Sequence, residues 1–127
     1  TIDCIITDHA PHSAEEKSKG LDGSAFGITG LETSLATVYT YLVRPGIISL
    51  SDMLRLMSGS PRSIFGIPGP GACIREGDPA DIAIVDFRTS YRIDAQSFLS
   101  MGRSTLFDGA EVYGRVEATF HKGIQVY

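Results

Sequence analysis

A short apolar segment that ends at a proline sets the strongest constraint on the fold. Apolar side chains in residues 1–7 fall on both faces of an extended chain, with Ile2, Cys4 and Ile6 on one side and Ile5 on the other. Because both faces are apolar, the segment predicts a strand buried from both sides, as in a parallel sheet. Pro11 lacks the amide hydrogen that a helix or central strand needs, so the strand must give way to a loop.

Composition excludes several classes of protein. With 127 residues, 43% of them hydrophobic, the chain can form a packed core. Eleven lysines and arginines against fifteen aspartates and glutamates give a net charge of −4, which argues against nucleic-acid and membrane-surface partners. No apolar run reaches the roughly 18 residues of a membrane span, and we expect a cytoplasmic protein. Cys4 and Cys73 lie in apolar, strand-like segments, which predicts two buried, reduced thiols.

A long loop and a helix follow the opening strand. Residues 13–28 are polar and glycine-rich, and loops of this length in compact domains are usually functional or disordered. Thr29 and Glu32 match the pattern of a capping box, which predicts a helix start. One apolar face then continues until Pro45 and Gly46 end the helix. The face consists of Leu31, Leu35, Val38 and Leu42.

Two further helical segments are expected before residue 66. One begins near Ser49 or Ser51 and carries apolar side chains on one side. A short third segment uses Ser60 as its N-cap, Pro61 at the first helical position and Gly66 as its C-cap.

The pattern changes to short strands after residue 71. Residues 71–76 and 81–87 predict strands that are joined by a turn through Gly77, Asp78 and Pro79. Alternation in residues 116–121 and a two-residue turn at Lys122 and Gly123 predict a terminal hairpin. The chain therefore reads as an α/β protein: a strand, a loop and helices, followed by a small all-β segment.

Asp8, His9 and His12 cluster where the opening strand ends. In α/β folds this edge collects catalytic and ligand-binding residues, because the loops there converge. A carboxylate in this position can bind a cation and accept a proton from a metal-bound water. Alternatively, Asp8 caps the loop and the histidines bond backbone carbonyls, since two histidines and one carboxylate are an incomplete zinc site. The spacing alone leaves both interpretations open.

Several segments, in this order along the chain, resemble the dihydroorotases of the amidohydrolase superfamily. The run Asp8-His9-Ala10-Pro11-His12 after an apolar strand is the most specific of them. The others are Glu15-Glu16-Lys17, Ala25-Phe26-Gly27-Ile28, Gly30-Leu31-Glu32-Thr33, Gly77-Asp78-Pro79-Ala80-Asp81-Ile82, residues 103–109 and Gly114-Arg115-Val116. The chain departs from the family pattern at Ser60-Pro61-Arg62, where relatives commonly have Asn-Pro-Ala, and at Ser104-Thr105-Leu106-Phe107, where Asn-Thr-Pro-Phe is usual.

The resemblance implies a fold larger than this chain. Residues 1–66 would be the C-terminal portion of a metal-dependent hydrolase (β/α)8 TIM barrel, comprising its last strand and flanking helices. Residues 67–127 would form part of a small composite β-sandwich. A barrel of about 250 residues cannot be built from one strand and three helices. We therefore expect a C-terminal segment of a longer enzyme, inactive in isolation, and a first residue that is not Met agrees with this expectation.

The resemblance also assigns roles to individual residues. It implies that Asp8 contacts zinc and acts as the general base that later protonates the leaving nitrogen. It implies that His12 binds the substrate carboxylate and that Phe26 and Gly27 offer backbone groups to the pyrimidine ring. From the residues alone, Phe26 could equally fold back into the core. We expect His9 to hold the loop through a hydrogen bond.

The remaining polar residues near the cluster have simpler interpretations. We expect Glu15, Glu16 and Lys17 to form a solvated face of the loop. His121, far along the chain in the terminal hairpin, is expected at the surface.

The implied activity is the interconversion of N-carbamoyl-L-aspartate and (S)-dihydroorotate in pyrimidine biosynthesis. It implies two zinc ions whose ligands lie mostly outside this chain, and a small-molecule substrate rather than nucleic acid or membrane. A full-length homodimer and association with other enzymes of the pathway are further expectations. The alternatives are an allantoinase or hydantoinase, a homologue without activity, and a stand-alone interaction module.

Overall fold

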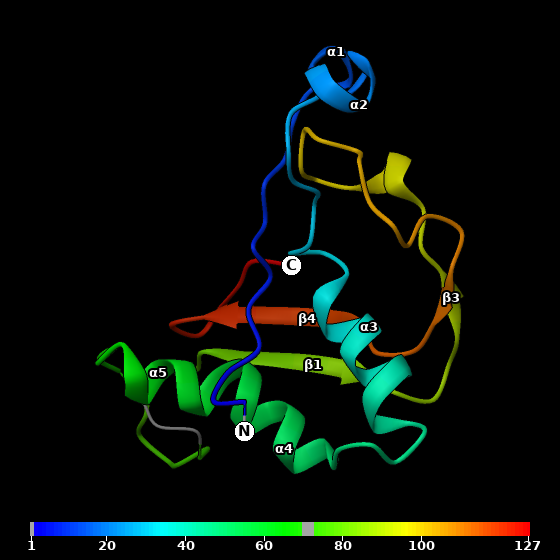
Figure 1. Ribbon diagram of the computed structural model, residues 1–127. Helices are drawn as coiled ribbons and strands as arrows, with labels where there is room; N and C mark the ends of the chain where they lie inside the picture. Colours follow the sequence, from blue (N-terminus) through cyan, green and yellow to red (C-terminus); the bar gives the residue numbers. More distant parts are fainter. Residues whose placement is uncertain (1, 70–72) are drawn as a thin grey trace.

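The computed structural model describes residues 2–69 and 73–127. Apart from one short helix, the helices lie in the first half of the chain and the strands in the second (Figure 1). The helical segments are α1 (Ala14–Lys17), α2 (Gly20–Gly23), α3 (Ser34–Val38), the π-helix η1 (Tyr39–Val43), α4 (Leu50–Leu54), the π-helix η2 (Arg55–Gly59), α5 (Ser60–Ile64) and the 3₁₀ helix η3 (Ala95–Ser97). The strands are β1 (Ile82–Asp86), β2 (Tyr91–Arg92), β3 (Glu111–Val112), β4 (Arg115–His121) and β5 (Ile124–Gln125).

The opening segment is not a strand in the structure, which corrects the prediction. Residues 2–10 have no strand partner, and residue 1 lies outside the described residues. The Ile5 amide donates to the Leu56 carbonyl at 2.9 Å, while Ile2 and Ile6 are each 71% exposed. A doubly covered strand needs a neighbouring strand on each side. No described residues supply such neighbours, so the segment stays extended and unpaired.

The first long helix forms where the sequence predicts it but begins differently. α3 and η1 run continuously from residue 34 to residue 43, ahead of Pro45 and Gly46. The expected capping box is absent, because its two residues bond elsewhere. The Thr29 hydroxyl donates to the Ser104 carbonyl at 2.9 Å, and the Glu32 carboxylate accepts from the backbone amide of Leu99 at 2.8 Å. Tertiary partners have displaced the local cap.

The next two predicted helices are one continuous helix over residues 50–64. It begins at Ser49, whose hydroxyl accepts from the Asp52 amide at 3.0 Å, as expected. Ser60 is not an N-cap, because its amide donates to Arg55 in a π turn. That wider turn stands directly before Pro61, which has no amide hydrogen to donate. The helix ends before Gly66, which adopts the positive φ of 61° expected of a C-cap.

The β segment contains two small antiparallel sheets. One has the strand order β1-β4-β5, and the other pairs β2 with β3. The strand predicted over residues 81–87 and the terminal hairpin are both confirmed. Lys122 and Gly123 form the hairpin turn with φ values of 50° and 83°. The Asp81 carboxylate secures that turn by accepting from the Lys122 amide at 2.8 Å and by contacting His121, which is exposed as expected.

The strand predicted over residues 71–76 does not form in its described part. Residues 73–76 are irregular, with Ile74 83% exposed, and residues 71 and 72 lie outside the described residues. Both cysteines are free thiols, as predicted. Cys4 is half-buried, but Cys73 is exposed, so the predicted burial of Cys73 is wrong.

The main hydrophobic core lies between α3 and the β segment. Ala36 of α3 is buried against a cluster around the β2–β3 ribbon, made of Ile93, Ala95, Phe98 and Val112. Tyr39 and Phe87 extend this contact, with ring centroids 4.3 Å apart. Among the described residues, none of the helices is long and apolar enough to cross a membrane.

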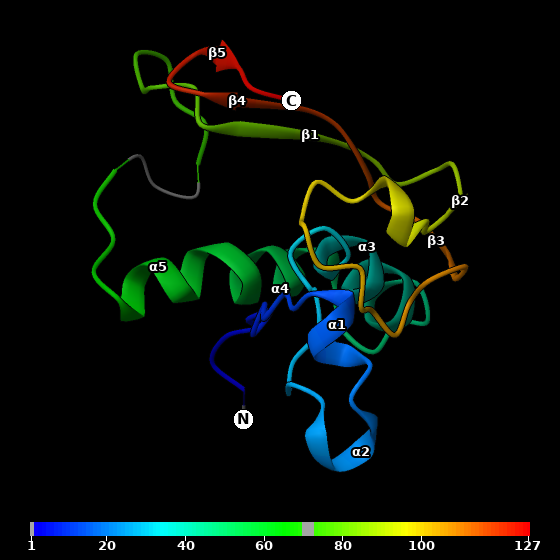
Figure 2. The same cartoon turned by 90° about the horizontal axis from the view of Figure 1, so that it is seen from above.

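The segment predicted as a long loop folds into a small lobe. Residues 13–24 contain α1 and α2, which project from the rest of the chain (Figures 1 and 2). Ser13 and Glu16 form a capping box at the start of α1. No side chain of either helix is buried, so hydrogen bonds rather than a hydrophobic core hold the lobe together.

The bonds of Glu32 predict a pH-dependent contribution to stability. Partial burial opposes ionisation, but the amides of Leu99 and Ser100 outweigh it and hold the pKa of Glu32 below its usual 4.5. Such a carboxylate stabilises the fold fully above the unfolded pKa and loses that contribution as the pH falls through the lower, folded pKa. We expect Glu32→Gln to lower the urea midpoint near neutral pH, and the difference from wild type to shrink below a pH of about 4.5.

Glu117→Gln is the control, because Glu117 is exposed on β4 and makes no side-chain hydrogen bond within the described residues. A gap between Glu32→Gln and wild type that keeps the same size at every pH would contradict this account.

Candidate functional site

Two segments distant in sequence lie side by side to form the candidate site. The Ala10 amide donates to the Ile28 carbonyl at 2.9 Å. His9 completes the connection, since its Nδ1 atom accepts from the amides of Gly30 at 3.0 Å and Leu31 at 3.3 Å. The expected loop-holding bond of His9 is therefore confirmed. Because backbone amides can only donate, the ring must carry its hydrogen on Nε2.

Asp8 stands at the exposed end of this connection. Its φ is 45°, a left-handed conformation that aspartate tolerates better than most residues. The carboxylate is exposed and accepts no hydrogen bond within the described part of the chain. The alternative role of Asp8 as a loop cap is therefore not what the structure shows, and its carboxylate is free to meet a ligand.

His12 and Gly27 lie in contact across the two segments. A Cβ atom built on Gly27 would lie 3.4 Å from His12 Nε2 and 2.5 Å from Ala10 Cβ. Gly27 also has a φ of 117°, so both the space and the backbone conformation require glycine. The other ring nitrogen of His12 faces Glu16, with Nδ1 3.7 Å from Oε2.

Phe26 does not fold back into the core, the alternative that the sequence left open. Its side chain is 94% exposed. The backbone on either side of it is nevertheless held in place, because the Ala25 carbonyl and the Gly27 carbonyl both accept hydrogen bonds. Phe26 therefore presents its ring outward from a fixed backbone.

The predicted solvated face is confirmed for Glu15 and Glu16, which are exposed, but it is wrong for Lys17. The amide and hydroxyl of Ser13 hold the pKa of Glu16 below its usual value, with a smaller effect from His12. Lys17 is half-buried, and its Nζ atom donates to the carbonyls of Ala25 at 2.9 Å and Gly27 at 3.1 Å. The Ser-x-x-Glu pattern at Ser13 could have indicated this helix.

The second half of the chain also contacts the site. A Cβ atom on Gly102 would lie 2.9 Å from Pro11 Cβ and 3.0 Å from the His12 nitrogen, so this residue packs directly on the histidine backbone. The bonds of Thr29 and Glu32 to residues 99–104 hold the same loop in place. Two regions about 90 residues apart are thereby held together.

The described residues do not form a metal site by themselves. They contain no cluster of three or more histidine, cysteine, aspartate or glutamate side chains that could hold an ion. Asp8 alone does not suffice, since zinc takes about four ligands. Two cavities have volumes of about 390 and 580 Å³, and neither is lined by Asp8 or His12. The first is lined by Ser58, Arg62 and residues 73–75 and 78–82, and the second by parts of α3, β2 and β4.

Comparisons with known proteins show which class of fold the chain has. No family model matches the chain. L-Hydantoinase (dihydropyrimidinase) from Arthrobacter aurescens has a similar structure, with a TM-score of 0.87 and 33% identity over 98% of this chain and 28% of that protein. D-Hydantoinase from a Bacillus species matches with a TM-score of 0.87 and 26% identity over the same shares. The chain thus has the fold of the corresponding part of hydantoinase-type amidohydrolases.

Among curated proteins, the chain is similar in sequence to dihydroorotases. Dihydroorotase from Lactiplantibacillus plantarum is 43% identical over all 127 residues, and dihydroorotase from Bacillus thuringiensis is 44% identical over 114 residues. The chain spans only 26–29% of the length of these relatives. It is a homologue of the C-terminal part of the dihydroorotases, which confirms the expected resemblance.

The tight packing at Gly27 can be tested by substitution, with Gly20 as the control position. Gly20 also has a positive φ, of 77°, but nothing lies within 4 Å of a Cβ atom placed there. Alanine at either position adds backbone strain of about 1–3 kcal/mol. We expect Gly27→Ala to lower the free energy of unfolding by about 2 kcal/mol more than Gly20→Ala does, because it also overpacks against Ala10. Urea denaturation measures both values, and equal losses would show that Gly27 is not closely packed.

Proposed function

We propose that this chain is the C-terminal part of a dihydroorotase that interconverts N-carbamoyl-L-aspartate and (S)-dihydroorotate in pyrimidine biosynthesis. The observation that carries the proposal is an exposed Asp8, four residues before a histidine, His12, that packs against Gly27. Identity of 43–44% to dihydroorotases, against 26–33% to the hydantoinases, supports this assignment over a hydantoinase activity.

Asp8 would act as the general base. Its carboxylate is exposed and has no protein partner in the described residues, so it can accept a proton from the attacking water. It would then return that proton to the amide nitrogen that leaves when the ring opens. The left-handed backbone at Asp8, followed directly by the anchored His9, fixes where this carboxylate stands.

His12 would bind the substrate carboxylate. It is half-buried, and Glu16 lies beside its Nδ1 atom, which leaves Nε2 on the side of Gly27. A donor at this position would favour an acid over a neutral cyclic amide. The backbone of Phe26 and Gly27, next to His12, would contact the polar edge of the pyrimidine ring.

A zinc centre is part of the proposal for the whole enzyme, although these residues do not build one. Asp8 would be a ligand from this chain, and most ligands of the two implied ions would lie outside it. When bound, zinc would polarise the amide carbonyl and lower the pKa of water.

We also propose the fold, oligomeric state and cellular location that the resemblance to dihydroorotases implies for the whole enzyme. Residues 1–66 would belong to a (β/α)8 barrel and residues 67–127 to a composite β-sandwich. The exposed Ile2 and Ile6 agree with a strand whose neighbours lie outside this chain. The whole enzyme would be a cytoplasmic homodimer that acts on a small molecule and associates with other pathway enzymes.

A hydantoinase-type activity is the second candidate, because the similar solved structures are hydantoinases. The two candidates differ in whether the substrate carries a carboxylate. They can therefore be separated by the substrates that the complete gene product accepts.

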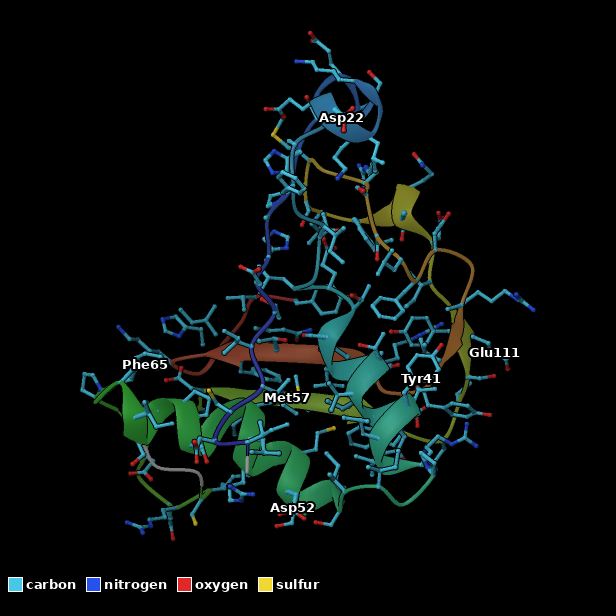
Figure 3. All side chains as sticks on the ribbon, in the orientation of Figure 1. Asp22, Tyr41, Asp52, Met57, Phe65 and Glu111 are labelled. Carbon is cyan, nitrogen blue, oxygen red and sulfur yellow. The ribbon has the colours of Figure 1, made fainter. Side chains whose placement is uncertain are left out.

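We expect the complete gene product to turn over dihydroorotate, and Asp8→Asn to lower kcat by about 10²-fold or more, because the proton acceptor is lost. Asp22→Asn is the matched control, since Asp22 lies at the far end of the projecting lobe (Figure 3). Steady-state assays with dihydroorotate, hydantoin and allantoin provide the measurement. Turnover of the neutral cyclic amides without turnover of dihydroorotate would reject the proposal.

A further inference from the structure

Lys17 makes an unusual set of contacts for a lysine on a short, exposed helix. Its Nζ atom donates to the carbonyls of Ala25 and Gly27, on either side of Phe26, at 2.9 and 3.1 Å. The side chain is half-buried, and within the described residues no carboxylate forms an ion pair with it. The ammonium charge is therefore held by neutral carbonyls only.

The same stretch of loop is bonded to α1 at two more points. The Ser24 hydroxyl donates to the Lys17 carbonyl at 2.9 Å, and the Ala25 amide donates to the Glu16 carbonyl at 3.1 Å. These two hydrogen bonds hold the beginning of the stretch. Past Ala25, Lys17 Nζ is the link from α1 to Gly27, whose position next to His12 is set by close packing.

We propose that Lys17 is a positioning residue for substrate recognition. It holds the Phe26–Gly27 backbone against His12, and it places a positive charge near the histidine assigned to the substrate carboxylate. The proposal rests on the proposed function and adds a specificity determinant to it. An anionic cyclic amide gains from both effects, whereas a neutral one gains only from the fixed backbone.

The test compares Lys17→Met, Lys17→Arg and the control Lys19→Met in the complete gene product. Lys19 is exposed on the same lobe and makes no side-chain hydrogen bond within the described residues. Hydrogen–deuterium exchange of peptides covering residues 24–28 reports on the loop without requiring activity. Steady-state kinetics with dihydroorotate report on substrate binding.

We expect Lys17→Met to accelerate exchange in residues 24–28 and to raise KM for dihydroorotate about tenfold, because two charge-assisted hydrogen bonds are lost. Its kcat should stay within about twofold, since no reacting group is removed. Lys17→Arg should recover part of the KM change, because it keeps the charge and the donors. Lys19→Met should match wild type in both measurements.

Unchanged exchange in Lys17→Met would show that Lys17 does not hold the loop. Faster exchange with an unchanged KM would reject the role in recognition while leaving the structural bond. A fall in kcat with KM unchanged would reject positioning in favour of a role in the chemical step. If the wild-type protein does not turn over dihydroorotate, the proposed function fails, and exchange still decides whether Lys17 fixes the Gly27 backbone.

Discussion

The amides of Gly30 and Leu31 both point at one ring nitrogen of His9, and the arrangement of the candidate site depends on this contact. By accepting hydrogen bonds from two backbone amides, His9 joins the end of the extended opening segment to the turn that leads into α3. Two neighbouring contacts join the same segments: the Ala10 amide bonds the Ile28 carbonyl, and Gly27 packs on His12. Asp8, the residue before His9, remains exposed to solvent.

A second set of contacts extends this arrangement into the β segment. Thr29 and Glu32, which have the sequence pattern of a helix cap, instead bind the loop over residues 99–104. That loop places Gly102 against the backbone of His12. Helix, site and β segment are thus connected by polar contacts around one small core, and Lys17 adds the same kind of support from the projecting lobe.

Local patterns predicted the parts of the fold that local interactions determine. The helix ending at Pro45 and Gly46 and the hairpin turning at Lys122 and Gly123 are confirmed, because periodicity and turn chemistry act over a few residues. The strand over residues 1–7 was wrong because a strand needs partners that its own sequence does not encode. In the site, His9 was anticipated, but the bonds of Lys17 were not, since its acceptors are backbone carbonyls and leave no residue pattern.

The tautomer of His9 tests the central claim most directly. Two-dimensional ¹H–¹⁵N spectroscopy of the labelled protein near neutral pH distinguishes the two ring nitrogens of each neutral histidine. We predict that His9 carries its hydrogen on Nε2, with Nδ1 unprotonated, because Nδ1 accepts from the Gly30 and Leu31 amides. A hydrogen on Nδ1, or rapid exchange between both tautomers, would contradict it, because the two segments would then lack their common anchor.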